Sequence, residues 1–104
     1  LKYIDFIVCN PPYIPTRNYL NLNKETLHDP RISLDGGKSG MDYYVKIINF
    51  LISVKFKGVV YFEIDPIITK KMYKLLLEKG VKIVYKKTDY LNLDRLIKIK
   101  FPTI

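Results

Sequence analysis

The chain has 104 residues, of which 48% are apolar and 27% are charged, and its 18 Lys and Arg residues outnumber 10 Asp and Glu residues. This balance fits one small globular domain and excludes a disordered chain. No apolar run approaches the roughly 18 residues of a membrane span, and we expect neither a signal peptide nor a membrane partner. The single cysteine, Cys9, can form neither an internal disulfide nor a cysteine-based zinc site, so a reducing, cytoplasmic location is expected.

The formal net charge of +8 makes nucleic acid a partner to consider. The cations are 15 Lys and only 3 Arg, and Arg is the residue that binds phosphates and guanines bidentately. The chain also contains no Ala, Gln or Trp, which indicates a bias of the whole proteome. We attribute about half of the basic excess to that bias, so nucleic acid is the less favoured partner.

The first predicted element is a strand over residues 1–9, because this run is rich in β-branched and aromatic residues. Nearly all of its positions are apolar, which is typical of a parallel strand covered on both faces. A strand of this kind rarely begins a domain, since its edge would lie unpaired. We therefore expect the natural protein to have residues before Leu1.

A loop over residues 10–40 follows, and then a helix over residues 41–54 with apolar residues at three- and four-residue spacing. A strand is predicted over residues 58–64. A second helix is predicted to open at Pro66, whose missing N–H does no harm in a first turn, and to end at Gly80.

Two more strands are predicted over residues 81–87 and 96–101. Their short connection requires antiparallel pairing, because a parallel crossover needs a dozen or more residues. The whole pattern predicts an α/β chain in which parallel strands are followed by an antiparallel hairpin at one edge of the sheet.

The most informative segment is Asn10-Pro11-Pro12-Tyr13, which directly follows the first strand. Proline after Asn10 restricts that residue to extended conformations and fixes the direction of its side chain. Because prolines donate no backbone N–H, the carbonyls around them are left free to accept hydrogen bonds. Together with the Asn10 carbonyl they can hold both hydrogens of an NH₂ group, while Tyr13 can stack on a planar amide or nucleobase.

Such a site suits methylation of an amide or exocyclic amino nitrogen. This nitrogen is a poor nucleophile, and the two accepted hydrogen bonds direct its lone pair and stabilise the positive charge that develops. The chemistry needs no metal and no covalent intermediate. Parallel pairing would bring Glu63 to the same carboxyl edge as Asn10, where either substrate contact or a structural role is open to it.

The Asn-Pro-Pro-Tyr segment resembles the signature of amino-group methyltransferases that use S-adenosylmethionine. Residues 29–44 further resemble the stretch that follows this signature in the HemK/PrmC family, and so do residues 60–64 and 94–95. That family methylates the side-chain amide of the glutamine in the Gly-Gly-Gln motif of peptide-chain release factors. The resemblance covers essentially the whole chain, in order.

The resemblance implies half of a Rossmann-like methyltransferase sheet, S-adenosylmethionine as cofactor and a release factor as partner. It implies catalytic roles for Asn10, Pro11, Pro12 and Tyr13. Asn10, Pro11 and Tyr13, with Glu63, would bind the substrate amide. Asn10 would also contact the cofactor.

The chain departs from the family pattern in two places. Asp65 and Pro66 stand where family members commonly have Gly soon followed by Gln, and the Gly usual before Asp94 is absent. The Gly-rich turn and the acidic residue that would hold the cofactor's methionine and ribose also do not occur. Residues 1–104 therefore resemble the carboxyl-terminal half of a catalytic domain, without the cofactor-binding half, and we expect the chain alone to be inactive.

Two other functions stay open. The same corner would serve an adenine or guanine amino methyltransferase that acts on a flipped base of DNA or RNA. The chain could also be an inactive half-domain that pairs with a partner chain through its first strand.

Several other residues invite simpler interpretations. Residues 35–40 are predicted to open the first helix, with Ser39 or Gly40 as N-cap, or else to shape a substrate channel. His28 is interpreted as a loop residue, Arg31 as one side of a solvated ion pair, and Cys9 as a packed strand residue.

Overall fold

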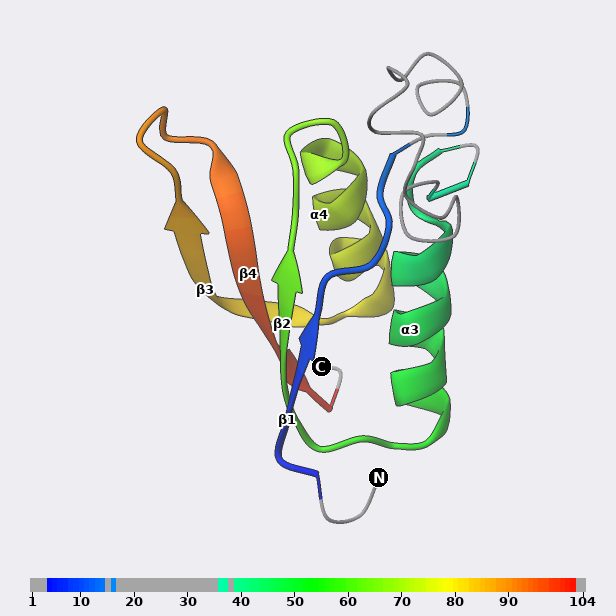
Figure 1. The fold of residues 1–104 in the computed structure, drawn as a ribbon. Helices are drawn as coiled ribbons and strands as arrows, with labels where there is room; N and C mark the ends of the chain where they lie inside the picture. The colour runs from blue at the N-terminus through cyan, green and yellow to red at the C-terminus, as the bar shows by residue number, and fades with distance from the viewer. Residues whose placement is uncertain (1–3, 15, 17–35, 38, 103–104) are drawn as a thin grey trace.

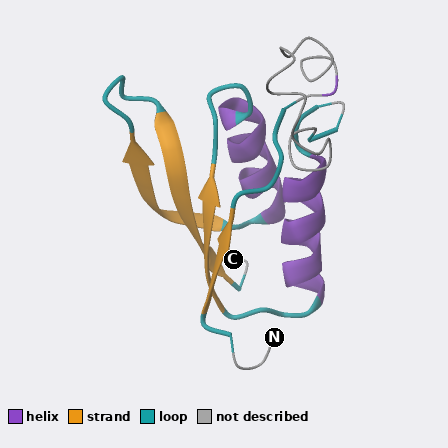
Figure 2. Ribbon diagram, in the orientation of Figure 1, coloured by secondary structure: helices purple, strands orange, loops and turns teal. Residues whose placement is uncertain are grey.

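The chain folds into a four-stranded mixed sheet with two helices on one of its faces (Figure 1). The computed structural model describes residues 4–14, 16, 36–37 and 39–102. The elements follow the predicted order (Figure 2) and are β1 (Phe6–Cys9), α3 (Asp42–Ser53), β2 (Gly58–Glu63), α4 (Thr69–Lys79), β3 (Lys82–Thr88) and β4 (Asp94–Phe101).

The strand order across the sheet is β1-β2-β4-β3. β1 pairs with β2 in parallel, with Phe6 opposite Val59 and Cys9 opposite Phe62. β4 is antiparallel to both β2 and β3. The predicted α/β class is therefore confirmed, with its parallel pair and its antiparallel hairpin at one edge.

Both helices cover the same face of the sheet. Alternate residues of β2 and β4 are buried against them, as the period of two along a strand requires. The helices contribute apolar residues at helical spacing, and the fully buried side chains on these four elements include Tyr44, Ile48, Leu51, Val60, Phe62, Met72, Leu76, Ile97, Ile99 and Phe101. One apolar core thus joins α3 and α4 to the sheet.

The two helices are short, with 12 residues in α3 and 11 in α4. Within the part of the chain that the structure describes, neither has the length and apolar character needed to cross a membrane.

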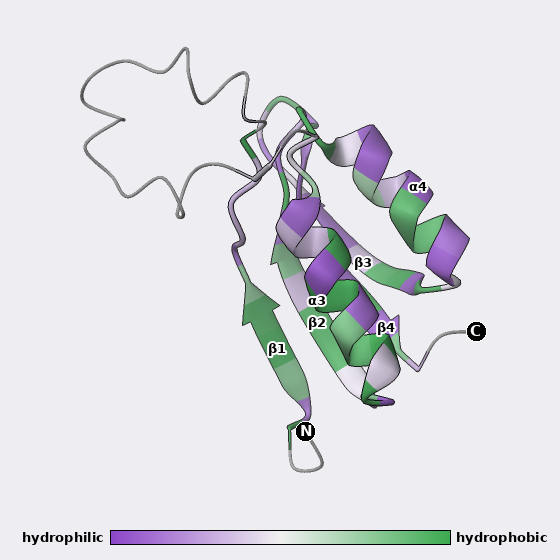
Figure 3. Cartoon of the chain, turned by 90° about the vertical axis from the view of Figure 1, so that its right-hand side faces the viewer, coloured by the Kyte–Doolittle hydropathy of each residue, from purple (hydrophilic) through white to green (hydrophobic). Residues whose placement is uncertain are grey.

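The opposite face of β1 is uncovered by the residues that the structure describes. Phe6 is 62% exposed and Val8 is 70% exposed, and Figure 3 shows β1 as an almost uniformly hydrophobic strand. β1 also lies at the end of the strand order, so its outer edge has no partner strand within the described ranges. Within the described residues only one face of β1 is covered, so cover on its second face stays a prediction. The strand itself is shorter than predicted and begins at Phe6.

The helix starts differ from the prediction. Pro66 lies in a turn, and α4 begins only at Thr69, with Ile68 as N-cap. The cause is Asp65, whose carboxylate oxygen accepts a hydrogen bond from Ile67 N at 3.0 Å and whose carbonyl accepts one from Ile68 N at 3.0 Å. These bonds close a turn before the helix can start. The predicted end is confirmed, because Gly80 is the C-cap in the left-handed conformation with φ of 67°.

The neighbouring residues Leu76 and Leu77 of α4 test this core. Leu76 is 1% exposed and Leu77 is 84% exposed. We expect Leu76→Ala to lower the free energy of unfolding by about 2 to 5 kcal/mol, because it leaves a cavity. Leu77→Ala, the matched control, should change it by less than about 0.5 kcal/mol. Urea unfolding of both variants measures the difference, and equal effects would contradict the assigned face of α4.

Candidate active site

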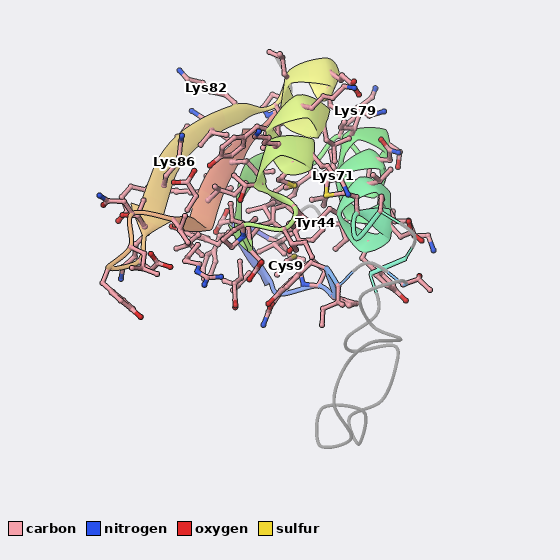
Figure 4. All side chains as sticks on the ribbon, turned by 90° about the horizontal axis from the view of Figure 1, so that it is seen from above. Cys9, Tyr44, Lys71, Lys79, Lys82 and Lys86 are labelled. Carbon is pink, nitrogen blue, oxygen red and sulfur yellow. The ribbon has the colours of Figure 1, made fainter. Side chains whose placement is uncertain are left out.

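The carboxyl ends of β1 and β2 lie side by side. Cys9 is opposite Phe62, so the residues that follow them, Asn10 and Glu63, leave the parallel pair at the same edge of the sheet. This juxtaposition was predicted from the sequence. Figure 4 views this end of the molecule from above, with Cys9 of β1 and Tyr44 of α3 close to one another. Ligands of open α/β sheets bind at such an edge.

Residues 10–13, which follow β1, form a corner of the chain and differ in burial. Asn10 is exposed, Pro11 is buried, and Pro12 and Tyr13 are half-buried. Tyr13 packs against the apolar core. Burial raises the pKa of the Tyr13 hydroxyl, and the negative charges of Asp65 and Glu63 raise it further. The Arg95 guanidinium, which is paired with Asp65, lowers this pKa, so charges of both signs act on the corner.

Glu63 has an exposed side chain and an anchored main chain. Its carbonyl accepts a hydrogen bond from the hydroxyl of Tyr44 at 2.6 Å. Tyr44 is fully buried in α3, and its ring lies 5.3 Å from that of Phe62. Burial, together with the nearby Tyr13 and Glu63, raises the pKa of Tyr44 well above its ordinary value of 10. Tyr44 was predicted only as part of an apolar stripe, and nothing in the helical spacing points to its hydrogen bond.

Gly36 connects the corner to the start of α3. Its N–H donates to the Ile14 carbonyl at 2.7 Å, and its carbonyl accepts from Asp42 N at 3.0 Å. A Cβ on Gly36 would lie 2.6 Å from the Pro12 carbonyl oxygen and 2.7 Å from Tyr13 Cα, so only glycine fits there. The segment thus supports the corner as well as the helix entry.

The N-cap of α3 is Met41, and the prediction of Ser39 or Gly40 was wrong. The hydroxyl oxygen of Ser39 instead accepts a hydrogen bond from Met41 N at 3.2 Å. Asp42 lies in the first turn of α3, where a negative charge favours the helix.

An ion-pair network ties β2 to the β3–β4 hairpin. Arg95 donates from Nη1 to Asp65 at 2.8 Å and from Nε to Asp89 at 2.9 Å. The Arg95 carbonyl also accepts from Ile64 N at 2.9 Å. Asp65 is one of the residues at which the chain departs from the resemblance to the HemK/PrmC family. Its ion pair with Arg95 anchors the hairpin to the end of β2. The pairing joins positions 30 residues apart, and sequence spacing gave no signal for it.

Three further residues singled out in the sequence, Cys9, His28 and Arg31, gain no catalytic role from the structure. Cys9 is half-buried, and burial raises the pKa of its thiol, as suits a packed strand residue. Within the described ranges no three His, Cys, Asp or Glu side chains gather closely enough to hold a metal ion. His28 and Arg31 lie outside the described residues.

The chain has curated relatives, each named release factor glutamine methyltransferase. The protein of Dictyoglomus turgidum is 31% identical over 101 residues, which are 94% of this chain and 36% of the relative. That of Chlamydia trachomatis is 31% identical over 93 residues, or 88% of the chain and 32% of the relative. That of Geobacter sulfurreducens is 49% identical over 45 residues, or 42% of the chain and 16% of the relative. No protein-family model matches.

The fold is that of an α/β chain whose mixed sheet is consistent with half of a methyltransferase domain. The chain is homologous to a stretch of the release factor glutamine methyltransferases, and the resemblance inferred from the sequence is confirmed. It spans about a third or less of the length of the relatives named above.

Tyr44→Phe tests the bond that anchors the end of β2. Removal of the hydroxyl leaves the Glu63 carbonyl without this donor, so we expect a loss of about 1 to 3 kcal/mol in the free energy of unfolding. Tyr43→Phe, at the partly exposed position before it, is the matched control, with an expected change below about 0.5 kcal/mol. Chemical unfolding monitored by circular dichroism compares the two, and a tolerated Tyr44→Phe would show that the bond contributes little.

Alkaline pH should also lower the free energy of unfolding. Burial raises the pKa of both Tyr44 and Tyr73 in the folded chain above the ordinary value of 10. Their contribution to stability is complete below pH 10 and declines as the pH rises toward the folded-state pKa, since the unfolded chain releases these protons first. Unfolding curves at pH 8 and above pH 10 should therefore show lower stability at the higher pH. A smaller decline in Tyr44→Phe identifies the part due to Tyr44.

Proposed function

We propose that residues 1–104 form the carboxyl-terminal half of the catalytic domain of an S-adenosylmethionine-dependent enzyme. Its substrate would be the side-chain amide of the glutamine in the Gly-Gly-Gln motif of peptide-chain release factors. One observation carries this proposal. In a homologue of release factor glutamine methyltransferases, Asn10 emerges exposed at the carboxyl end of a parallel strand, next to Glu63 and directly before Pro-Pro-Tyr.

In this proposal the corner binds and orients the amide. The Asn10 side-chain carbonyl and the main-chain carbonyl of Pro11 accept the two N–H bonds of the substrate NH₂ group. The ring of Tyr13 stacks on the amide plane, and Pro12 keeps the turn rigid. The nitrogen lone pair is then directed away from the corner, toward the methyl carbon that it attacks.

A negative charge near the corner would favour the positive charge that develops on the substrate nitrogen. As the nitrogen takes the methyl group, whose bond to the sulfonium sulfur would break and leave a neutral thioether, the nitrogen becomes positive. It would return to neutrality by releasing one of its two protons to solvent. The exposed Glu63, which ends β2 at the same edge as Asn10, is the carboxylate that would favour this positive charge, since Asp65 is paired with Arg95. No general base is needed to begin the reaction.

S-adenosylmethionine would supply an electrophilic methyl group on a sulfonium. The described residues fit only the substrate side of its site, where Asn10 would contact it. The Gly-rich turn and the ribose-binding acid are absent from the sequence. We therefore propose that the cofactor half docks on the free edge and exposed face of β1, beside a shallow apolar groove lined by Asp5, Phe6, Val8, Val59, Tyr61 and Leu96.

Methylation of nucleic acid is the second candidate, and the net charge of +8 favours it. The corner would hold the exocyclic amine of a flipped adenine or guanine with the same acceptors. The homology to release factor glutamine methyltransferases makes it the weaker candidate. The third is an inactive half-domain that pairs with a partner chain through β1.

Methyl transfer by the complete natural protein that contains this chain distinguishes the three. With labelled S-adenosylmethionine and release factor as substrate, we expect Asn10→Ala to lower the rate by about a hundredfold or more, because one of two positioning acceptors is lost. Asn49→Ala, on the exposed side of α3, is the matched control and should leave the rate unchanged.

Duplex DNA is offered in parallel, and the isolated chain serves as a second control. Label on DNA alone would overturn the glutamine proposal in favour of the nucleic-acid one. No label on either substrate would favour the inactive half-domain. Full activity of the isolated chain would refute the proposal that a cofactor-binding half is missing from it.

A further inference from the structure

The turn between β3 and β4 presents an apolar tip, formed by Tyr90, Leu91 and Leu93. Tyr90 is 94% exposed, Leu91 is 62% exposed and Leu93 is 39% exposed. Residues of such turns are usually small and polar, because water surrounds them. Three apolar side chains at one turn therefore call for an explanation beyond folding.

The apolar tip lies at the same edge as the candidate active site. Glu63, the last residue of β2, is opposite Leu96 near the start of β4, and Asp94 at that start is opposite Thr88 at the end of β3. The antiparallel directions thus bring the β3–β4 turn to the carboxyl edge of β1 and β2. Figure 1 shows the turn, in orange, at the upper end of the molecule, on the other side of the β2–α4 connection from the segment that follows β1.

Asp89 holds the apolar tip in one conformation. One of its carboxylate oxygens accepts hydrogen bonds from Leu91 N at 2.8 Å and from Leu93 N at 3.1 Å. Its backbone N–H donates to the Leu93 carbonyl at 3.0 Å, and its carbonyl accepts from Asn92 N at 3.0 Å. Asn92 adopts the left-handed conformation that the turn requires, with φ of 62°. An ordered turn loses less conformational entropy when it binds.

The same carboxylate couples the apolar tip to the end of β2. Arg95 bridges Asp89 and Asp65 at 2.9 and 2.8 Å, and its carbonyl accepts a hydrogen bond from Ile64 N at 2.9 Å. The tip is therefore tied to the residues that directly follow Glu63, at the edge where Asn10 leaves β1.

We propose that the apolar tip is a docking surface for the folded protein that carries the methyl-accepting amide. This inference rests on the proposed function, which makes that protein a release factor. An enzyme that modifies one side chain of a large protein gains affinity and orientation from contacts beyond the reacting group. Tyrosine and leucine on a rigid turn fit a shallow apolar pocket of the partner, and tyrosine is prominent among residues that dominate binding energy.

Other exposed apolar residues have different surroundings. Phe6 and Val8 lie on the open face of β1, where the cofactor half is proposed to dock. Leu77 lies on the outer side of α4, in the same helix as the exposed Lys70 and Lys74. Only the apolar tip combines exposure, order and a link to the corner within the described residues.

The test uses the complete natural protein with release factor as substrate. We expect the double variant Tyr90→Ser/Leu91→Ser to raise KM for release factor about tenfold, because the apolar contact is lost, while kcat at saturation stays within about twofold. Leu77→Ser is the control, since it removes a leucine of α4 that is more exposed than Leu91, and it should change neither constant. Asp89→Ala keeps the apolar groups and loosens the turn, so a smaller rise in KM is expected.

Titration of release factor onto each variant measures binding without catalysis. Binding weakened about tenfold by the double variant alone would support the docking surface. An unchanged KM and unchanged binding would overturn it, and so would an equal effect of Leu77→Ser. A fall in kcat without a change in KM would place these residues in the corner chemistry instead. Failure of the proposed function appears separately, as absence of methyl transfer in the parent protein and all variants.

Discussion

The parallel register of β1 and β2 is the constraint on which the rest of the structure depends. It brings Asn10 and Glu63 to one edge and leaves the two prolines to turn the chain away from the sheet. The register is fixed by burial, since a slip of one residue would move Val60 and Phe62 from the helix-covered face to the open one. The position of the candidate active site is thus set by the same apolar packing that stabilises the fold.

The carboxyl edge combines an anchored main chain with charged side chains of both signs. The buried hydroxyl of Tyr44 anchors the end of β2, and Gly36 supports the turn after β1 through backbone hydrogen bonds. Asp65 begins the turn that delays α4 and also pairs with Arg95. The carboxylate of Asp65 therefore closes a turn, anchors the β3–β4 hairpin and acts on the pKa of Tyr13.

The sequence predicted what depends on local pattern. Alternation and helical spacing gave the order of the elements, and the Asn-Pro-Pro-Tyr segment predicted a corner at the end of a strand. It did not predict what depends on tertiary contacts. A tyrosine in an apolar stripe gives no sign that its hydroxyl reaches a carbonyl 19 residues away, and neither does an Asp–Arg pair that spans 30 residues. Pro66 was misplaced for a similar reason, because the hydrogen bonds of Asp65 outweigh the preference of proline for a first helical turn.

Two of the exposed apolar surfaces in the described residues, the face of β1 and the tip at Tyr90, differ in physical character. The face of β1 is broad, belongs to a strand with a free edge and carries the ordinary residues of a protein interior, which suits permanent burial against another part of the same domain. The tip at Tyr90 is small, held by Asp89 and remote from the sheet interior, which suits a contact that forms and breaks. The protein-modifying enzyme proposed above would need both kinds, because its two halves would have to stay together while its substrate would have to leave.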